Sequence, residues 1–378
     1  NLFDILIIDE ASQCDIISAL PLFYRAKHLV IIGDPYQLKH ISLLTEPQDR
    51  HLATTHQLPE ELFTELSYTK HSLYDLAENI KKKHNESPIL LNEHYRCHHD
   101  IVDFSNEYYY DRKLSIQTDE TRLLQHPTLQ KRILWHHVKG KTVPAKSPYN
   151  EEEAEHVVEE TLRLLELAST TKASIGIVTL FRAQTEIITE KLQKFKDLFE
   201  NDITIGTAHK FQGDEKDIIL FSPAISDGAK PGTLHWIQTT NQLLNVAVTR
   251  ARSLFIIIGD HGICRQTTGP LRNLSDYVDM TQSAFQNDDS PAKKILSDEL
   301  KKQKIPVVPN YIVHSEIPYL IDYALFVNGK RYALQLKNSN TQIMEKQFKE
   351  KNWSIRWFSA EQVMTNLPIL IEEIKRLC

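Results

Sequence analysis

Six short, mostly apolar runs constrain the fold of this chain more than any other feature. They cover residues 4–9, 28–33, 174–179, 203–207, 217–221 and 253–259, and helical or loop segments such as 183–199 separate them. Runs without strict polar alternation are typical of strands buried on both faces of a parallel sheet. Strands that alternate with helices form repeated βαβ units. The sequence therefore predicts an α/β protein with parallel sheets.

Length and composition indicate two or three globular domains. The chain has 378 residues, of which 41% are hydrophobic and 25% are charged, which is enough to bury several cores. The sequence shows no signal peptide and no apolar run near the roughly 18 residues that a membrane span needs. Cys14, Cys97, Cys264 and Cys378 are far apart and form no C-x-x-C pair. We therefore expect a reduced, cytoplasmic setting without membrane contact.

A pair of carboxylates follows the first apolar run. Residues 7–13 read IIDEASQ, which puts Asp9 and Glu10 at the carboxyl end of a predicted strand. In such a pair Asp9 could hold Mg²⁺ through its water shell, and Glu10 could orient or deprotonate the water that attacks a γ-phosphate. The next run ends in GDPYQL at residues 33–38, where Gln37 could sense the γ-phosphate. The alternative for this second segment is a turn capped by Asp-Pro.

The sequence lacks the phosphate-binding loop that should accompany these carboxylates. Such a P-loop reads G-x-x-x-x-G-K-[ST], and its backbone N–H groups and Lys hold the phosphates. The only Gly-Lys-Thr lies at residues 140–142, and Trp135 stands where the first glycine should be. We therefore expect the C-terminal part of a longer nucleotide-driven protein, or one half of a split one. We do not expect this chain to hydrolyse ATP alone.

Five motifs, in this order and spacing, resemble those of superfamily 1 helicases of the Upf-like branch. They are DEASQ at residues 9–13 (motif II), GDPYQL at 33–38 (III), EHYRCH at 93–98 (IV), GTAHKFQGDE at 206–215 (V) and NVAVTRAR at 245–252 (VI). The resemblance covers about residues 1–265. It implies an incomplete first RecA-like domain over residues 1–88 and a complete second one over 89–280. It also implies ATP and Mg²⁺ as cofactors and single-stranded nucleic acid as the partner.

The resemblance assigns roles to individual side chains. Fixed positive charge near the γ-phosphate stabilises phosphoryl transfer, and Arg96 and Arg250 are the candidates, with Arg252 as a salt-bridged, structural arginine. The other implied contacts are those of Gly213 and Glu215 with the nucleotide, and those of Thr207 and His209 with the nucleic-acid backbone. Leu180 and Phe181 stand where the family usually has Pro and Tyr, which weakens the expectation of a nucleic-acid contact from that loop.

Residues 94–99 also contain several metal-binding residue types. His94, Cys97, His98 and His99 lie close together in sequence. Cys97 and His98 are adjacent rather than at ligand spacing, however, and no second cluster is near in the sequence. The motif IV resemblance explains these residues better, so we do not expect zinc here.

A C-terminal unit is predicted from residue 291, after a polar linker at residues 281–290. Residues 291–378 carry 14 lysines and arginines against nine acidic residues, whereas residues 1–290 carry 30 against 41. A basic tail on an acidic body indicates a nucleic-acid partner. A solvated, lysine-rich face is the alternative.

The C-terminal unit is predicted to place three polar side chains on one face of a hairpin. A helix at residues 291–303 precedes strands at 319–327 and 330–337, which an Asn-Gly turn joins. Asp322 lies on the first strand, and Gln335 and Lys337 lie two residues apart on the second. The unit then continues with a helix at 345–351, a strand at 353–358 and a helix at 361–377.

This pattern resembles the PD-(D/E)xK restriction-endonuclease-like fold, in the variant of very-short-patch-repair nucleases. The resemblance implies a small α+β domain in which Asp322 and Gln335 bind Mg²⁺, Lys337 supports the attacking water, and Glu299 is an additional acidic residue. An acidic residue is more usual than glutamine at position 335. The alternative is an inactive, DNA-binding remnant.

Together these features predict the C-terminal segment of an ATP-dependent DNA helicase with an appended nuclease-like domain, acting in DNA repair or in defence against foreign DNA. The first alternative is a non-catalytic nucleic-acid-binding module or split-helicase subunit whose partner supplies the P-loop. The others are an RNA helicase and a stand-alone nuclease steered by an inactive motor remnant.

Overall fold

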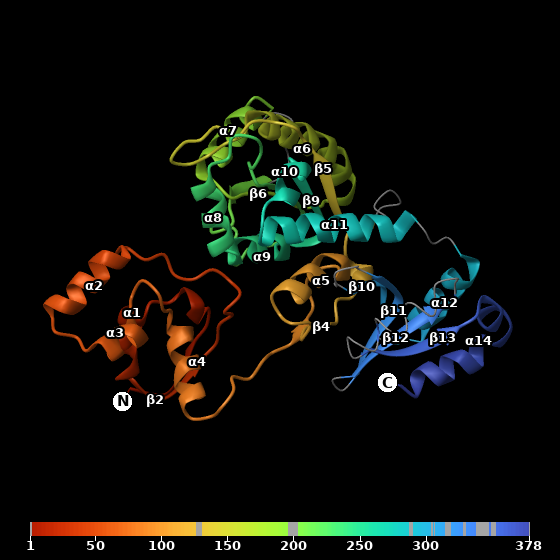
Figure 1. Cartoon of the computed structure of the whole chain (residues 1–378), viewed down its shortest axis with the longest axis horizontal. Coiled ribbons are helices and arrows are strands. Elements are labelled where there is room, and N and C mark those ends of the chain that lie inside the picture. The colour runs from red at the N-terminus through yellow and green to blue at the C-terminus, as the bar shows by residue number, and fades with distance from the viewer. Residues whose placement is uncertain are drawn as a thin grey trace. The chain divides into compact units, whose positions relative to one another are not determined.

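The structure, a computed structural model, consists of two compact units, Asn1–Ser275 and Asp276–Cys378 (Figure 1). It describes residues 2–125, 131–195, 203–286, 290–303, 305, 307–313, 319–327, 330–337, 348 and 353–377. We describe each unit separately. The division falls inside a helix, α11 (Pro270–Gln286), so the expected linker at 281–290 is helical as far as Gln286.

The first unit begins with a two-stranded parallel sheet and short helices. Its elements are β1 (Phe3–Ile8), the 3₁₀ helix η1 (Ala11–Gln13), α1 (Ile16–Phe23), β2 (Ala26–Ile31), α2 (Glu46–Thr55), α3 (Glu60–Leu66) and α4 (Leu73–Lys83). Ala11, Ala19 and Leu73 form a small core. In the described part of the chain β1 pairs only with β2, which leaves Phe3 and Ile7 56% and 62% exposed. The prediction that this strand is buried on both faces is therefore wrong.

The rest of the first unit surrounds a five-stranded parallel sheet in the order β5-β9-β8-β6-β7. The strands are β5 (Ile133–His137), β6 (Ile175–Thr179), β7 (Ile203–Thr207), β8 (Lys216–Ser222) and β9 (Ala251–Gly259). The helices are α5 (His99–Tyr108), η2 (Glu120–Arg122), α6 (Glu151–Thr171), α7 (Arg182–Gln193), α8 (Pro231–Thr239), α9 (Gln242–Thr249) and α10 (His261–Gln266), and β3 (Glu93–His94) pairs with β4 (Ser115–Ile116).

This sheet confirms the predicted parallel βαβ arrangement. Strands β6, β7, β8 and β9 lie where the apolar runs place them, and β6 and β9 are buried almost throughout. The strand β5 was not predicted because its sequence, ILWHH, ends in two histidines. Helices α6 and α7 pack on the sheet through a core that includes Val157, Ile177, Ile188 and Leu220. This core fixes the amino ends of β8 and β9, where the candidate site lies.

The second unit has a four-stranded mixed sheet in the order β10-β11-β12-β13. Its elements are α12 (Pro291–Lys302), β10 (Val307–Val313), β11 (Tyr319–Val327), β12 (Lys330–Leu336), β13 (Trp353–Phe358) and α14 (Ala360–Lys375). The predicted hairpin strands, the 353–358 strand and both long helices are confirmed, whereas β10 was not predicted. The Asn-Gly turn and most of the predicted 345–351 helix lie outside the described residues.

The helices α12 and α14 pack together against the sheet of the second unit. Leu296 and Leu300 of α12 share a core with Leu334 and with Ile371 of α14. Across the described parts of the whole chain, no helix combines the length and the apolar character that a membrane span requires.

Candidate nucleotide-hydrolysis site

The acidic pair lies where β1 ends and η1 begins. Glu10 adopts a left-handed backbone conformation (φ 53°), which residues other than glycine and asparagine rarely adopt. The Glu10 N–H donates to Asp9 Oδ1 at 2.8 Å, and Gln13 Nε2 donates to Glu10 Oε2 at 3.0 Å. Both carboxylates are exposed and keep lone pairs available. Exposed carboxylate oxygens are the donors that Mg²⁺ takes, so these residues fit the ion.

Ser12 joins the acidic segment to the GDPYQL segment. Its hydroxyl accepts from the Asp34 N–H and donates to the Asp34 carbonyl oxygen, both at 2.8 Å. Gly33 permits this approach, because a Cβ there would lie 2.8 Å from the Tyr74 ring and 3.0 Å from Ser12 Oγ. The two motifs therefore form one rigid corner.

The GDPYQL segment also contacts the second motif-bearing region of the first unit. Gln37 Nε2 donates to Asp34 Oδ2 at 3.1 Å, and the Tyr110 hydroxyl donates to the same oxygen at 2.6 Å. Asn245 of α9 donates to the Tyr36 carbonyl oxygen at 2.8 Å. The structure thus places Gln37 in a hydrogen-bonded group that spans both regions.

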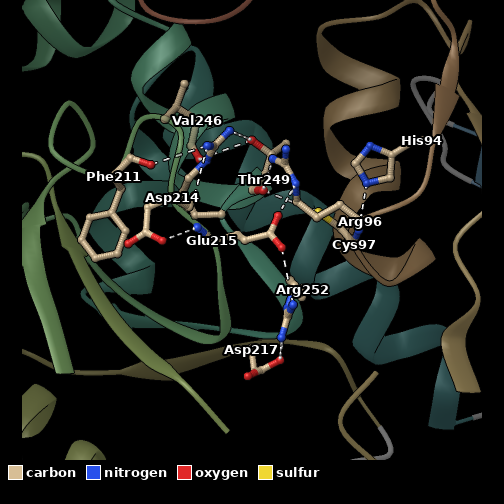
Figure 2. A network of polar contacts seen from close by, with 11 residues as sticks. His94, Arg96, Cys97, Phe211, Asp214, Glu215, Asp217, Val246, Thr249 and Arg252 are labelled. Carbon is tan, nitrogen blue, oxygen red and sulfur yellow. Dashed lines mark hydrogen bonds and ion pairs between the residues drawn. The ribbon is translucent and has the colours of Figure 1, made fainter. Parts of the chain in front are cut away.

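Arginines and carboxylates alternate at the amino ends of β8 and β9 (Figure 2). Arg96 Nε lies 2.7 Å from Glu215 Oε2. Arg252 contacts Glu215 at 3.4 Å and pairs closely with Asp217. Arg252 is thus salt-bridged, as expected, and Glu215 binds both Arg96 and Arg252. About two fifths of the Arg96 and Glu215 side chains remain exposed, so this pair is open to exchange with another anion.

Arg250, by contrast, is buried and held in a fixed orientation. It is 3% exposed and donates to the carbonyl oxygens of Val246 at 3.1 Å, Asp214 at 3.2 Å and Phe211 at 3.5 Å. Burial lowers its pKa, as does the nearby charge of Arg96, while the Glu10 carboxylate acts in the opposite direction. The structure therefore fixes the Arg250 guanidinium beside the loop that carries Asp214 and Glu215.

The residues around Arg96 fix its backbone. His94 Nε2 accepts from the Cys97 N–H at 2.9 Å, and the Cys97 thiol donates to the Thr249 carbonyl oxygen at 3.5 Å. Burial and the charge of Arg96 lower the pKa of His94 to about 4, so its neutral ring remains an acceptor at pH 7. His94 and Cys97 are positioning residues here.

The remaining motif V residues lie at the end of β7 and on the loop that joins it to β8. Thr207 ends β7, and His209 is exposed. Gly213 has a φ of +81°, a left-handed conformation that favours glycine, and it precedes the turn at Asp214 that brings Glu215 to Arg96. Within the described residues, the side chains of Thr207 and His209 form no hydrogen bond, which leaves them available to a ligand.

In the second unit, Asp322 and Gln335 lie opposite each other on β11 and β12. Gln335 Oε1 accepts from the Asp322 N–H at 2.9 Å, and Asp322 Oδ2 accepts from the Leu336 N–H at 2.6 Å. The other Asp322 oxygen forms an ion pair with Lys293 of α12. Because the Lys293 ammonium occupies Asp322 Oδ1 and repels a second cation there, the arrangement does not fit a magnesium ion beside Lys293.

Lys337 and Glu299, which the sequence predicts beside Asp322 and Gln335, do not lie in this group. The Lys337 side chain is exposed and forms no ion pair with Asp322. Glu299 accepts instead from Gln303 Nε2 at 2.7 Å on its own helix, and it lies six residues, about 9 Å along the axis, from Lys293. The ammonium beside Asp322 comes from Lys293. Sequence reasoning missed Lys293 because nothing distinguishes it from the neighbouring lysine on α12.

A five-stranded parallel sheet flanked by helices, with arginines and carboxylates at the amino ends of its strands, fits a RecA-like domain. A family profile described as AAA domain matches residues 72–262, just over half of the chain, and a second profile of the same description matches residues 1–42. The chain therefore belongs to this family of AAA domains. Its AAA domains are of the kind found in superfamily 1 helicases.

Similar proteins carry helicase names. Helicase sen1 of Schizosaccharomyces pombe is 30% identical over 268 residues, which cover 68% of this chain and 14% of that protein. Probable helicase senataxin of Homo sapiens is 29% identical over 265 residues, or 68% of this chain and 9% of that protein. Putative helicase mov-10-B.1 of Danio rerio is 28% identical over 295 residues, or 70% of this chain and 28% of that protein. The chain thus spans well under half the length of these relatives.

Proposed function

We propose that this chain supplies the water-activating and arginine-bearing half of an ATP-dependent helicase that moves along single-stranded DNA. The observation that carries the proposal is the arginine and carboxylate group, in which three backbone carbonyl oxygens hold Arg250 and the partly exposed Arg96 forms an ion pair with Glu215. A carboxylate that can activate water, next to fixed arginines, is the arrangement that γ-phosphate hydrolysis requires.

The two arginines have different roles in this proposal. Arg250 is held by backbone carbonyl oxygens, so its charge is pre-organised and costs no rearrangement during the reaction. Among the described residues, Arg96 binds a partly exposed carboxylate and one carbonyl oxygen, so it can turn from Glu215 to an incoming phosphate. Magnesium, when bound at Asp9, would neutralise phosphate charge. Glu10 would orient the attacking water. Gln37 would contact the γ-phosphate and connect it to Tyr110 through the Asp34 carboxylate, to which both side chains donate.

The proposed hydrolysis needs a phosphate-binding loop, which residues 1–378 do not contain and which we propose is supplied upstream in the same protein or by a partner chain. The exposed apolar side chains of β1 support this proposal because they offer a surface that further elements of an α/β domain could cover. A chain that receives no P-loop at all would be the non-catalytic binding module instead.

The test is DNA-stimulated ATP hydrolysis by a protein that includes the P-loop, with Glu10→Gln and Arg250→Lys variants. We expect each variant to lose roughly a thousandfold or more in kcat, as arginine fingers and catalytic carboxylates typically contribute. Arg163→Lys, at an exposed arginine of α6 that pairs with Glu160, is the matched control. Full activity of both site variants would overturn the proposal.

A further part of the proposal is that the nucleic acid is DNA rather than RNA. It rests on the excess of basic residues in the segment 291–378 and on the resemblance of that segment to nucleases that act on DNA. Thr207 and His209 would contact the backbone of the strand. Unwinding of matched DNA and RNA duplexes decides between a DNA and an RNA helicase, since preference for RNA would favour the alternative.

Nucleic-acid cleavage by the second unit, in repair or defence against foreign DNA, is a separate proposal. The cross-strand pair Asp322 and Gln335 supports it, whereas Lys293 opposes it by occupying the carboxylate. Cleavage of single-stranded and duplex DNA with Mg²⁺ or Mn²⁺ tests it, with Asp322→Ala and Lys337→Ala for comparison. Cutting that both variants lose would establish a nuclease, and no cutting by the parent would leave a DNA-holding domain.

A further inference from the structure

A second group of polar side chains lies at the start of α5. His98 caps this helix, His99 begins it, and Glu120 reaches them from η2. One ligand atom from each of the three residues lies within 4.8 Å of the other two. The distances are 3.5 Å from His98 Nε2 to Glu120 Oε2 and 2.5 Å from His99 Nδ1 to Glu120 Oε1. Glu120 is 21 residues from His99, so sequence spacing does not reveal this group.

Asp100 contacts the opposite side of both imidazole rings. Its carboxylate oxygens lie 2.9 Å from His99 Nε2 and 3.5 Å from His98 Nδ1. The ring nitrogens that do not face Glu120 therefore face Asp100. For His99 this is the surrounding that metal-binding histidines have in proteins, because a carboxylate that accepts the second ring N–H fixes the tautomer and the orientation of the ring. His98 Nδ1 is held differently, because it accepts from the Asp100 N–H at 3.2 Å.

The charge of the group also suits a cation, because the carboxylates of Asp100 and Glu120 both face the two imidazole rings.

We propose that His98, His99 and Glu120 bind a zinc ion, with Asp100 orienting both imidazoles. Two nitrogen ligands and one carboxylate suit Zn²⁺, whereas Mg²⁺ and Ca²⁺ prefer oxygen ligands only. The 3.5 Å between His98 Nε2 and Glu120 Oε2 agrees with two ligands that each lie about 2.1 Å from one ion, whereas the 2.5 Å between His99 Nδ1 and Glu120 Oε1 is a hydrogen-bond distance that has to lengthen by about 1 Å when the ion binds.

The place of this group in the fold indicates a structural role. The His98 N–H donates to the Arg252 carbonyl oxygen at 2.8 Å, and Arg96 is two residues before His98. A metal that ties His98 to η2 would therefore hold the backbone that carries Arg96 against β9. This role does not depend on the proposed helicase activity.

The test is zinc binding by the full chain after chelator treatment, measured as metal content and by competition with a chromogenic chelator. We expect a zinc equivalent that is lost from both the His99→Gln and Glu120→Gln proteins. We expect Asp100→Asn to bind zinc about 10- to 100-fold more weakly, as is usual for residues that orient metal ligands. His136→Gln, at a half-exposed histidine near Glu160, should bind zinc like the parent.

Binding by the parent is itself decisive, so the proposal does not depend on the stability of the variants. A parent that binds no zinc overturns it, and so does zinc retained at parent affinity in both ligand variants. Cobalt(II) substitution provides a second measurement on the unmutated protein. Visible absorption of a nitrogen- and oxygen-ligated cobalt site is expected, and its absence in a cobalt-loaded parent would contradict the assignment.

Discussion

The hydroxyl of Tyr110 lies 2.6 Å from a carboxylate oxygen of Asp34. This hydrogen bond joins the GDPYQL segment to the region after α5, and Gln37 shares the same carboxylate oxygen. Burial and the charge of Asp34 raise the pKa of Tyr110, so the hydroxyl keeps its proton and remains a donor. The contact links Gln37, the proposed γ-phosphate sensor, to the region that carries the arginines.

Removal of that hydroxyl should weaken the link measurably. We expect Tyr110→Phe to lower the free energy of unfolding by about 1 to 3 kcal/mol, the usual contribution of a hydrogen bond to a charged group. Denaturant unfolding measures this change. Tyr95→Phe, at an exposed tyrosine bonded to Glu93, should have a much smaller effect. Equal effects of the two variants would contradict the assignment.

The ion pair between Lys293 and Asp322 should be coupled energetically. Both side chains are largely buried, and loss of one partner of a buried pair leaves an uncompensated charge that typically costs 3 to 5 kcal/mol. We expect Lys293→Met and Asp322→Asn each to destabilise the second unit. The double variant should be destabilised by less than the sum of the two changes.

A double-mutant cycle on denaturant unfolding measures this coupling. Lys302, which is 74% exposed and 3.5 Å from Glu299, provides the control. Lys302→Met should change stability little, because exposed ion pairs contribute below about 1 kcal/mol. Additive effects of the Lys293 and Asp322 changes would show that the pair is not coupled.

Glu153 should make stability depend on pH. It is fully buried and accepts from the Ser222 hydroxyl and the Ala224 N–H, both at 2.6 Å. Burial raises its pKa from 4.5 to about 8 despite these donors, and Asp260 adds to the rise. Between these two values the folded state holds a proton that the unfolded state releases. Stability should therefore fall as pH rises from about 5 to 8.

The Glu153→Gln protein tests this sign. Glutamine keeps the acceptor oxygen without the charge, so its stability should fall less between pH 6 and 8. The expected difference in slope is on the order of 1 kcal/mol per pH unit. Unfolding at several pH values measures it, with the exposed Glu155→Gln as control. Parallel pH profiles for the parent and Glu153→Gln would contradict the prediction.

The sequence predicts those strands and site residues that a pattern within one short segment of the chain identifies. The runs of β6, β8 and β9 are apolar because those strands are buried on both faces, and Asp9, Glu10, Arg96 and Arg250 could be singled out from their motifs. Strands without that burial are less predictable. The histidines of β5 conceal its strand character, and β1 reads as a buried strand although the described chain exposes it.

Side-chain partnerships over long sequence distances could not be predicted. Lys293 and Asp322 are 29 residues apart, and nothing in their sequences indicates that the helix and the strand meet there. Glu120 likewise reaches His99 only because η2 folds back onto the start of α5. Such pairs depend on packing of whole elements, so a pattern within one segment cannot specify them.

Gly33 offers the most direct check of the corner that Ser12 and Asp34 form. An added Cβ would lie 2.8 Å from the Tyr74 ring and within about 3 Å of Ser12. We expect Gly33→Ala to cost about 1 to 3 kcal/mol of unfolding free energy, as overpacking usually does. Gly232→Ala is the control, because a Cβ there meets nothing within 4 Å and the residue lies in a helix. That change should be neutral or stabilising. Tyr74→Ala in the Gly33→Ala background should relieve part of the strain, so no coupling between the two positions would mean that the ring is not what fills this corner.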